Sequence, residues 1–88
     1  MLDNLPYSHF ESIQQKTIRG TPDILGCING VFVALELKAH LGAAISPMQQ
    51  HKLSSIVKAG GYAYIICPEN WEEIYQKLKL LSEQKINA

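Results

Sequence analysis

The sequence has no excess charge of either sign, no long apolar run and few cysteines. Eight Lys and Arg residues balance eight Asp and Glu residues, which excludes histone-like or polybasic-tail binding of nucleic acid but not a local basic patch. The longest apolar stretches, at residues 31–35 and 62–67, are far shorter than the about 20 residues that span a bilayer. No basic segment followed by an apolar one opens the chain, so we expect no secretion signal and a cytoplasmic protein.

Cysteine is scarce as well, with Cys27 and Cys67 alone. In a chain without a secretion signal we expect both to be reduced thiols that pack as small hydrophobic side chains. The 88 residues, 47% of them hydrophobic, have the composition of a globular protein and leave room for one domain, residues 1–88. So small a core predicts modest stability, which a partner subunit would improve.

The pattern along the chain predicts the order strand, strand, strand, helix, strand, helix. After an irregular segment at residues 1–8 we expect strands at 10–18, 23–28, 31–38 and 62–67, the last of them buried on both faces. Asn29-Gly30 predicts a two-residue hairpin turn. Ser46 and Gln49 form a capping-box pattern at the start of the first helix, and Gly60-Gly61 ends it. The strands that flank this helix should be parallel, which gives a small α+β domain with a mixed sheet.

The hairpin pairing predicted from the Asn29-Gly30 turn brings charged residues together. Counting outward along the two strands places Asp23 opposite Glu36, and Lys38 lies two residues farther on the same face. The other face would carry an uninterrupted apolar stripe of Val31, Val33, Leu35 and Leu37.

This charged group has two interpretations. In the first, Glu36 and Lys38 lie on a solvated strand face and Asp23 lies at its frayed end. In the second, the two carboxylates form an oxygen site for a hard divalent cation, which would keep water and a substrate phosphate as its other ligands. Lys38 would then stabilise negative charge on that phosphate in the transition state.

The chain resembles a known nuclease family in the segments that carry these residues. Pro22-Asp23 followed by Glu36-Leu37-Lys38 is similar to the motif of the restriction-endonuclease-like PD-(D/E)XK superfamily. The resemblance to its virus-type replication-repair nuclease (VRR-NUC) domain is closer and covers residues 19–67. Its elements occur in family order: Gly20-Thr21-Pro22-Asp23, Asn29-Gly30, Glu36-Leu37-Lys38, Ser46-Pro47-Met48-Gln49 and Ala59-Gly60-Gly61.

The resemblance implies a Mg²⁺- or Mn²⁺-dependent endonuclease that hydrolyses phosphodiester bonds of DNA. By position, Asp23 and Glu36 would be metal ligands together with the backbone carbonyl of Leu37, and Lys38 would be the catalytic lysine. Gln49 matches a family glutamine that orients the lysine or the attacking water, although the capping box alone also accounts for it. Many relatives add a glutamate from an N-terminal helix that is missing here, and Glu11 is the nearby acidic residue that could replace it.

A DNA-binding side is suggested by basic residues that flank the motifs, whereas the last helix is rich in glutamate. The residues assigned to it are Lys16, Arg19 and Lys52. Tyr62, Tyr64 and Trp71 are expected in the core or in an interface rather than as base-stacking platforms.

Three functions compete at this point. The first is cleavage of branched DNA such as four-way (Holliday) junctions by a homodimer, in a phage or prophage protein of a bacterial host cell. The second is a catalytically idle DNA-binding or assembly module that keeps the nuclease fold. The third is hydrolysis of small phosphoesters, which the sequence supports least because it shows no Gly-rich phosphate-binding loop.

Overall fold

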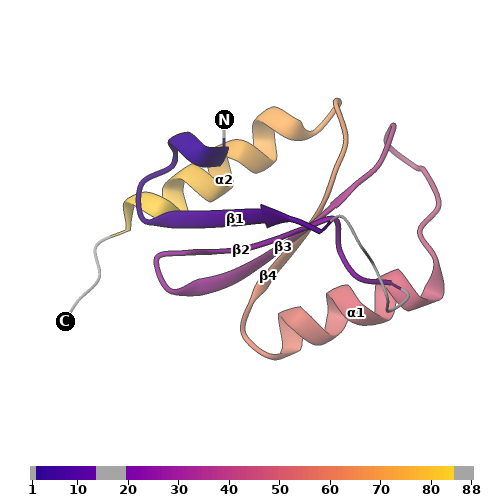
Figure 1. Cartoon of the computed structure of the whole chain (residues 1–88). Coiled ribbons are helices and arrows are strands. Elements are labelled where there is room, and N and C mark those ends of the chain that lie inside the picture. Colours follow the sequence, from indigo (N-terminus) through magenta and orange to yellow (C-terminus); the bar gives the residue numbers. More distant parts are fainter. Residues whose placement is uncertain (1, 14–19, 85–88) are drawn as a thin grey trace.

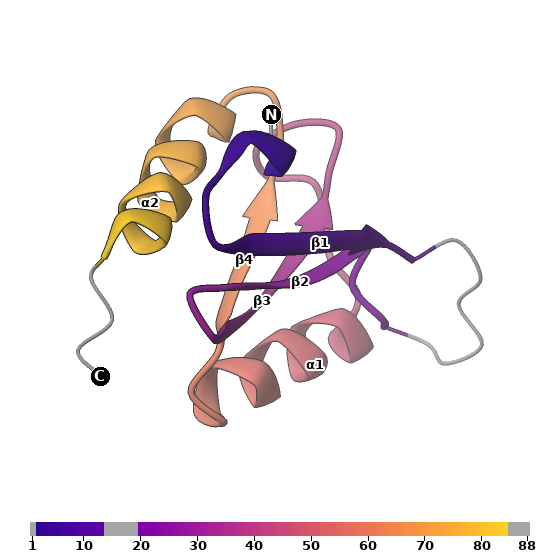
Figure 2. The same cartoon turned by 60° about the vertical axis from the view of Figure 1, so that its left-hand side comes forward.

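A four-stranded mixed sheet with a helix on each face forms the domain in the computed structural model, which describes residues 2–13 and 20–84. The elements are η1 (Leu2–Asn4, one 3-10 turn), β1 (Ser8–Ser12), β2 (Ile24–Ile28), β3 (Val31–Leu37), α1 (Pro47–Lys58), β4 (Tyr62–Ile66) and α2 (Trp71–Glu83). The strand order is β1-β2-β3-β4, antiparallel as far as β3, with β3 and β4 parallel. Helix α1 lies against one face, and α2 and η1 lie over the other, as Figure 1 and Figure 2 show. The α+β class and the parallel pair are as predicted.

The β2–β3 hairpin has the predicted register. Ile28 pairs with Val31 and Ile24 with Leu35, and the turn residues Asn29 and Gly30 have positive φ angles of 53° and 82°. Both angles are those that a two-residue type I′ turn requires. Asp23 therefore lies just before the paired part of β2, beside the end of β3.

Asn29 has a second role that the sequence pattern did not indicate. Its side-chain Nδ2 donates hydrogen bonds to the carbonyl oxygens of Leu81, Ser82 and Gln84 at 2.9, 3.3 and 2.7 Å. Carbonyl groups in the last turn of a helix have no partner within the helix, so Asn29 satisfies the end of α2 and joins it to the hairpin.

The start of the chain differs from the prediction. The first strand begins at Ser8 rather than at residue 10, because its register with β2 starts with Ser8 opposite Ile28. It ends at Ser12, and residues 14–18 of the predicted strand lie outside the described residues. The segment before it is not wholly irregular, since residues 2–4 form a 3-10 turn and Leu5, only 5% exposed, joins the core.

The hydrophobic core lies between α2 and the sheet. Ile74, Leu78 and Leu81 recur at helical spacing and form the buried side of α2. With residues from the N-terminal segment and from three strands they make one cluster: Leu5, Ile28, Val33, Leu35, Ile66, Ile74, Leu78 and Leu81.

Three expectations about burial are wrong. β4 is an edge strand of the described sheet, so its Ile65 is 36% exposed instead of buried on both faces. Leu37, at the end of β3, is 49% exposed because it lines an open groove beside the first turn of α2. Cys67 is buried, but Cys27 is exposed because it shares with Phe32 the part of the α1 face that the helix leaves open. Both thiols are free, as expected.

Within residues 2–13 and 20–84, neither helix has both the length and the apolar character needed to cross a membrane.

Candidate active site

The central feature of the site is a buried carboxylate, that of Glu36, which is only 3% exposed. Side chains alternate along β3, so Val33 and Leu35 face α2 whereas Ala34 and Glu36 face α1. The interpretation of Glu36 as a residue on a solvated strand face is therefore wrong, because α1 covers that face. A buried carboxylate is costly unless neighbouring groups compensate it.

Gln49 on α1 is one of the groups that compensate Glu36. Its Nε2 donates a hydrogen bond of 2.9 Å to Oε2 of Glu36. Its Oε1 accepts hydrogen bonds from the backbone N–H of Ser46 at 2.9 Å and from Nζ of Lys38 at 3.3 Å. Ser46 Oγ accepts from the Gln49 N–H at 3.1 Å, so the predicted capping box is confirmed. The same amide thus caps α1 and holds Glu36 of β3 and Lys38, the residue after β3.

Lys38 follows the last residue of β3 and is held at both its backbone and its side chain. Its N–H donates to the carbonyl oxygen of Ile66 at 2.8 Å, which continues the pairing with β4. Its side chain is 18% exposed, and its Nζ lies 4.0 Å from Oε2 of Glu36. The lysine therefore places a positive charge between the buried carboxylate and solvent.

Asp23, the residue just before β2, lies beside the same group. One of its carboxylate oxygens, Oδ2, accepts a hydrogen bond of 2.8 Å from the backbone N–H of Leu37, the residue between Glu36 and Lys38. The segment that leads to Asp23 lies against the start of α1. Gly20 has a φ of +81°, and a Cβ built there would lie 2.8 Å from the carbonyl oxygen of Met48. Only glycine allows this close approach without strain.

The structure thus brings together predicted residues from the start of β2, the end of β3 and α1: Asp23, Glu36, Leu37, Lys38 and Gln49. Their donor chemistry fits a hard cation, because Mg²⁺ and Mn²⁺ prefer oxygen ligands and Mg²⁺ is usually held by one or two carboxylates with water completing its shell. No group of three or more His, Cys, Asp or Glu side chains within residues 2–13 and 20–84 could hold a metal ion. A cation here would therefore depend on the two carboxylates, with a backbone carbonyl and water.

Other predicted residues lie elsewhere. Glu11 is on β1 opposite Leu25, and its described contact is with Nε2 of His9 at 3.9 Å, where both side chains are about three-quarters exposed. It does not contact the cluster. Lys16 and Arg19 lie outside the described residues. Lys52 is partly exposed, three residues after Gln49 on α1, and so lies on nearly the same side of that helix.

A contact that the sequence did not predict ties the loop after β3 to the segment before α2. The backbone N–H of Leu41 donates a hydrogen bond of 3.0 Å to Oε2 of Glu69. This bond, more than any other interaction, holds the pKa of the Glu69 carboxyl below its ordinary value of 4.5. No local pattern signals the contact, since 28 residues separate its partners.

Comparison with protein-family models, with curated proteins and with solved structures finds no match for this chain.

Proposed function

We propose that the protein is a divalent-metal-dependent DNA endonuclease of the VRR-NUC type. The observation that carries the proposal is the burial of the Glu36 carboxylate beside Lys38 and Gln49, with the Asp23 carboxylate bound to the intervening backbone. Burying an ionisable network beneath α1 costs stability, and departures of this kind from an apolar interior occur chiefly at functional sites.

In this proposal each residue has a defined part in the hydrolysis of a phosphodiester. Asp23, Glu36 and the Leu37 carbonyl would hold Mg²⁺ or Mn²⁺, which when bound polarises the phosphate and lowers the pKa of water. A water oxygen bonds to phosphorus, the bond to one ester oxygen breaks, and that oxygen leaves with a proton. Lys38 stabilises the negative charge that develops on the phosphate. Gln49 is a positioning residue, because its amide holds both Glu36 and Lys38.

We further propose that the substrate is branched DNA and that the working form in the host cytoplasm is a homodimer. A four-way junction has paired strands related by a two-fold axis, and one chain carries one site. A symmetric dimer would supply two sites with matching symmetry. Light scattering at micromolar concentration should give twice the 9.8 kDa mass of one chain. A protein that is monomeric alone and binds each junction as a single chain would contradict paired cutting.

The test of the enzyme itself is incubation of labelled duplex, flap and four-way-junction DNA with Mg²⁺ or Mn²⁺. The parent protein should cut branched DNA, and Asp23→Asn should not. A charge-neutral control is Gln50→Ala, which changes an exposed neighbour of Gln49 on α1. Equal cleavage by the parent and by Asp23→Asn would refute the assignment of the site.

An idle DNA-binding module is the second candidate, and one observation favours it. Oε2 of Glu36 already accepts from Gln49 and lies near Lys38, and a network with a purely structural role would look the same. Binding of junction DNA without cleavage in either metal would establish this alternative.

A further inference from the structure

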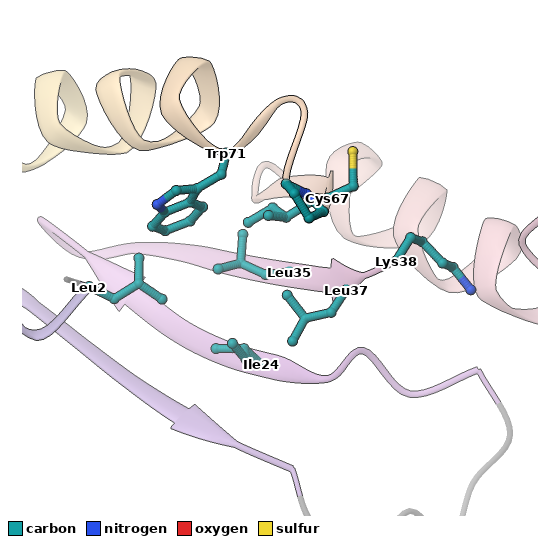
Figure 3. A pocket seen from close by; sticks show the side chains of 9 residues that line it. Leu2, Ile24, Leu35, Leu37, Lys38, Cys67 and Trp71 are labelled. Carbon is teal, nitrogen blue, oxygen red and sulfur yellow. The ribbon is translucent and has the colours of Figure 1, made fainter. Parts of the chain in front are cut away.

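A groove of about 700 Å³ opens on the α2 face of the sheet, at the same end of β3 as the carboxylates. Its walls are almost wholly apolar and come from η1, β2, β3, β4 and the start of α2, through Leu2, Ile24, Leu37, Ile66 and Trp71 (Figure 3). The volume is within the range of about 300–1,000 Å³ that is usual for sites that bind small organic groups. An organic group of moderate size could therefore enter it.

The groove and the candidate active site share the end of β3. Consecutive side chains of a strand point to opposite faces, so Leu37 lines the groove while Glu36 and Lys38 face α1. The stem of Lys38 also lines the groove, but its amine points away from Leu37 and toward α1 (Figure 3). A phosphate bound at that amine would therefore lie past the end of β3 from the groove, on the α1 side of the sheet.

Trp71 gives the groove an aromatic surface. Its indole projects from the first turn of α2 toward the strands, above Leu35 in the view of Figure 3. It is partly buried, packs against the core and lies 5.5 Å from the ring of Tyr75. The expectation that Trp71 belongs to the core is met only in part, because the side chain also lines an open groove.

We propose that this groove binds an unstacked nucleobase of the strand whose phosphate lies at Lys38, a proposal that rests on the proposed nuclease function. Aromatic stacking on a base is tolerant of sequence, because every base has a π-face. Taking a base out of a duplex costs energy, least where the base is already unpaired. The groove therefore favours DNA with unpaired nucleotides at a branch over a continuous duplex.

A nucleobase suits the groove better than a protein strand does. The groove floor includes β3, which pairs with β2 on one side and β4 on the other. No backbone edge of β3 is left for another strand to pair with, so an occupant must bind through its faces, as a flat aromatic ring does. A second copy of the chain that inserts an apolar side chain is the competing occupant.

The test uses Trp71 as its own reporter, because it is the one tryptophan of the chain. Its fluorescence is followed while flap DNA, four-way-junction DNA or a blunt duplex of equal length is added, with Ca²⁺ in place of Mg²⁺ to prevent cleavage. Branched DNA should quench the emission in step with binding measured by anisotropy, and the duplex should quench it much less. Trp71→Ala should weaken binding of flap DNA about five- to 150-fold, the range for loss of one base–aromatic stack.

A second variant keeps the test valid if Trp71→Ala does not fold. Leu37→Ser changes a side chain that is 49% exposed, and Leu80→Ser is its matched control, since Leu80 is 66% exposed on α2 outside the groove. Leu37→Ser should weaken binding of flap DNA relative to duplex, and Leu80→Ser should leave this ratio unchanged.

The remaining outcomes separate the two proposals. One outcome is cleavage of flap DNA with Mn²⁺ while Trp71 emission is unchanged and the two serine variants bind equally. This outcome would overturn nucleobase binding in the groove and would leave the proposed nuclease function standing. If Trp71 emission changes with protein concentration in the absence of DNA, the groove binds a second copy of the chain. That result would overturn the proposal that it binds a nucleobase. If no DNA is bound or cut, both proposals fail.

Discussion

Replacing Gln49 with alanine should be among the most destabilising changes on the surface of α1. The change removes three side-chain hydrogen bonds at once: to the Glu36 carboxylate, from the Lys38 amine and from the Ser46 N–H. Two of these bonds are made with charged groups, the buried Glu36 carboxylate and the Lys38 amine. The third is half of the capping box.

The size of the effect follows from these contacts. A hydrogen bond to a charged group contributes about 1.5–3 kcal/mol, and loss of a helix cap costs about 0.5–2 kcal/mol. Counting the 2.9 Å bond to Glu36 and the cap, and leaving out the longer 3.3 Å bond from Lys38, Gln49→Ala should lower the free energy of unfolding by about 2–5 kcal/mol. The total for a chain of this length is roughly 4–13 kcal/mol. At about 4–8 °C per kcal/mol for a domain of this size, the Tm should fall by about 8–40 °C.

Urea denaturation followed by circular dichroism measures this loss. Gln50→Ala is the matched control, because Gln50 is exposed and its side chain makes one long hydrogen bond of 3.4 Å to Ser54; its effect should stay within about 0.5 kcal/mol. Ser46→Ala removes the cap alone and should cost about 1 kcal/mol. If Gln49→Ala and Gln50→Ala unfold at the same urea concentration, the contacts of Gln49 with Glu36 and Lys38 do not stabilise the fold.

Four further outcomes are expected. Mn²⁺ should raise the Tm of the parent by binding the native state, and Asp23→Asn should abolish that rise in a thermal scan; an undiminished rise would place the metal elsewhere. Lys38→Ala should slow single-turnover cleavage about 10²–10³-fold but retain binding of junction DNA, because the lysine acts chiefly in the transition state; equal losses would make it only a phosphate contact. The lowered pKa of Glu69 stabilises the folded state above pH 4.5, and this contribution is lost as the pH falls through the folded-state pKa. Hydrogen exchange of the Leu41 amide should therefore lose protection on acidification in the parent, and Glu69→Gln should remove this pH dependence. Asn29→Gly keeps the positive φ of the turn but loses the cap on α2, so it should lower the free energy of unfolding by about 1–3 kcal/mol in urea; no change would mean that solvent satisfies those carbonyls equally well.

Local chemistry made much of the fold predictable. The Asn29-Gly30 turn requires positive φ at both residues, and this sets the register that places Asp23 beside the end of β3. The pattern of Ser46 and Gln49 predicts the start of α1 for an equally local reason. The position of a strand in the sheet and the burial of its faces were harder to predict. The apolar run at residues 62–67 would have the same sequence in a central strand as in the edge strand seen here. Cys27 was misassigned for a related reason, since nothing near it indicates how far α1 extends over the sheet.

Strand alternation and hairpin register are short-range geometry, so the amino-acid pattern alone indicates which residues can act together in the candidate site. The burial of Glu36 is a long-range effect, since it depends on α1 packing over its face of the sheet. The same packing lets the Gln49 amide cap its helix and hold Glu36 and Lys38. The groove beside Trp71 depends on where α2 begins relative to β3 and β4. These features arise from contacts between segments far apart in the chain, which local patterns do not encode.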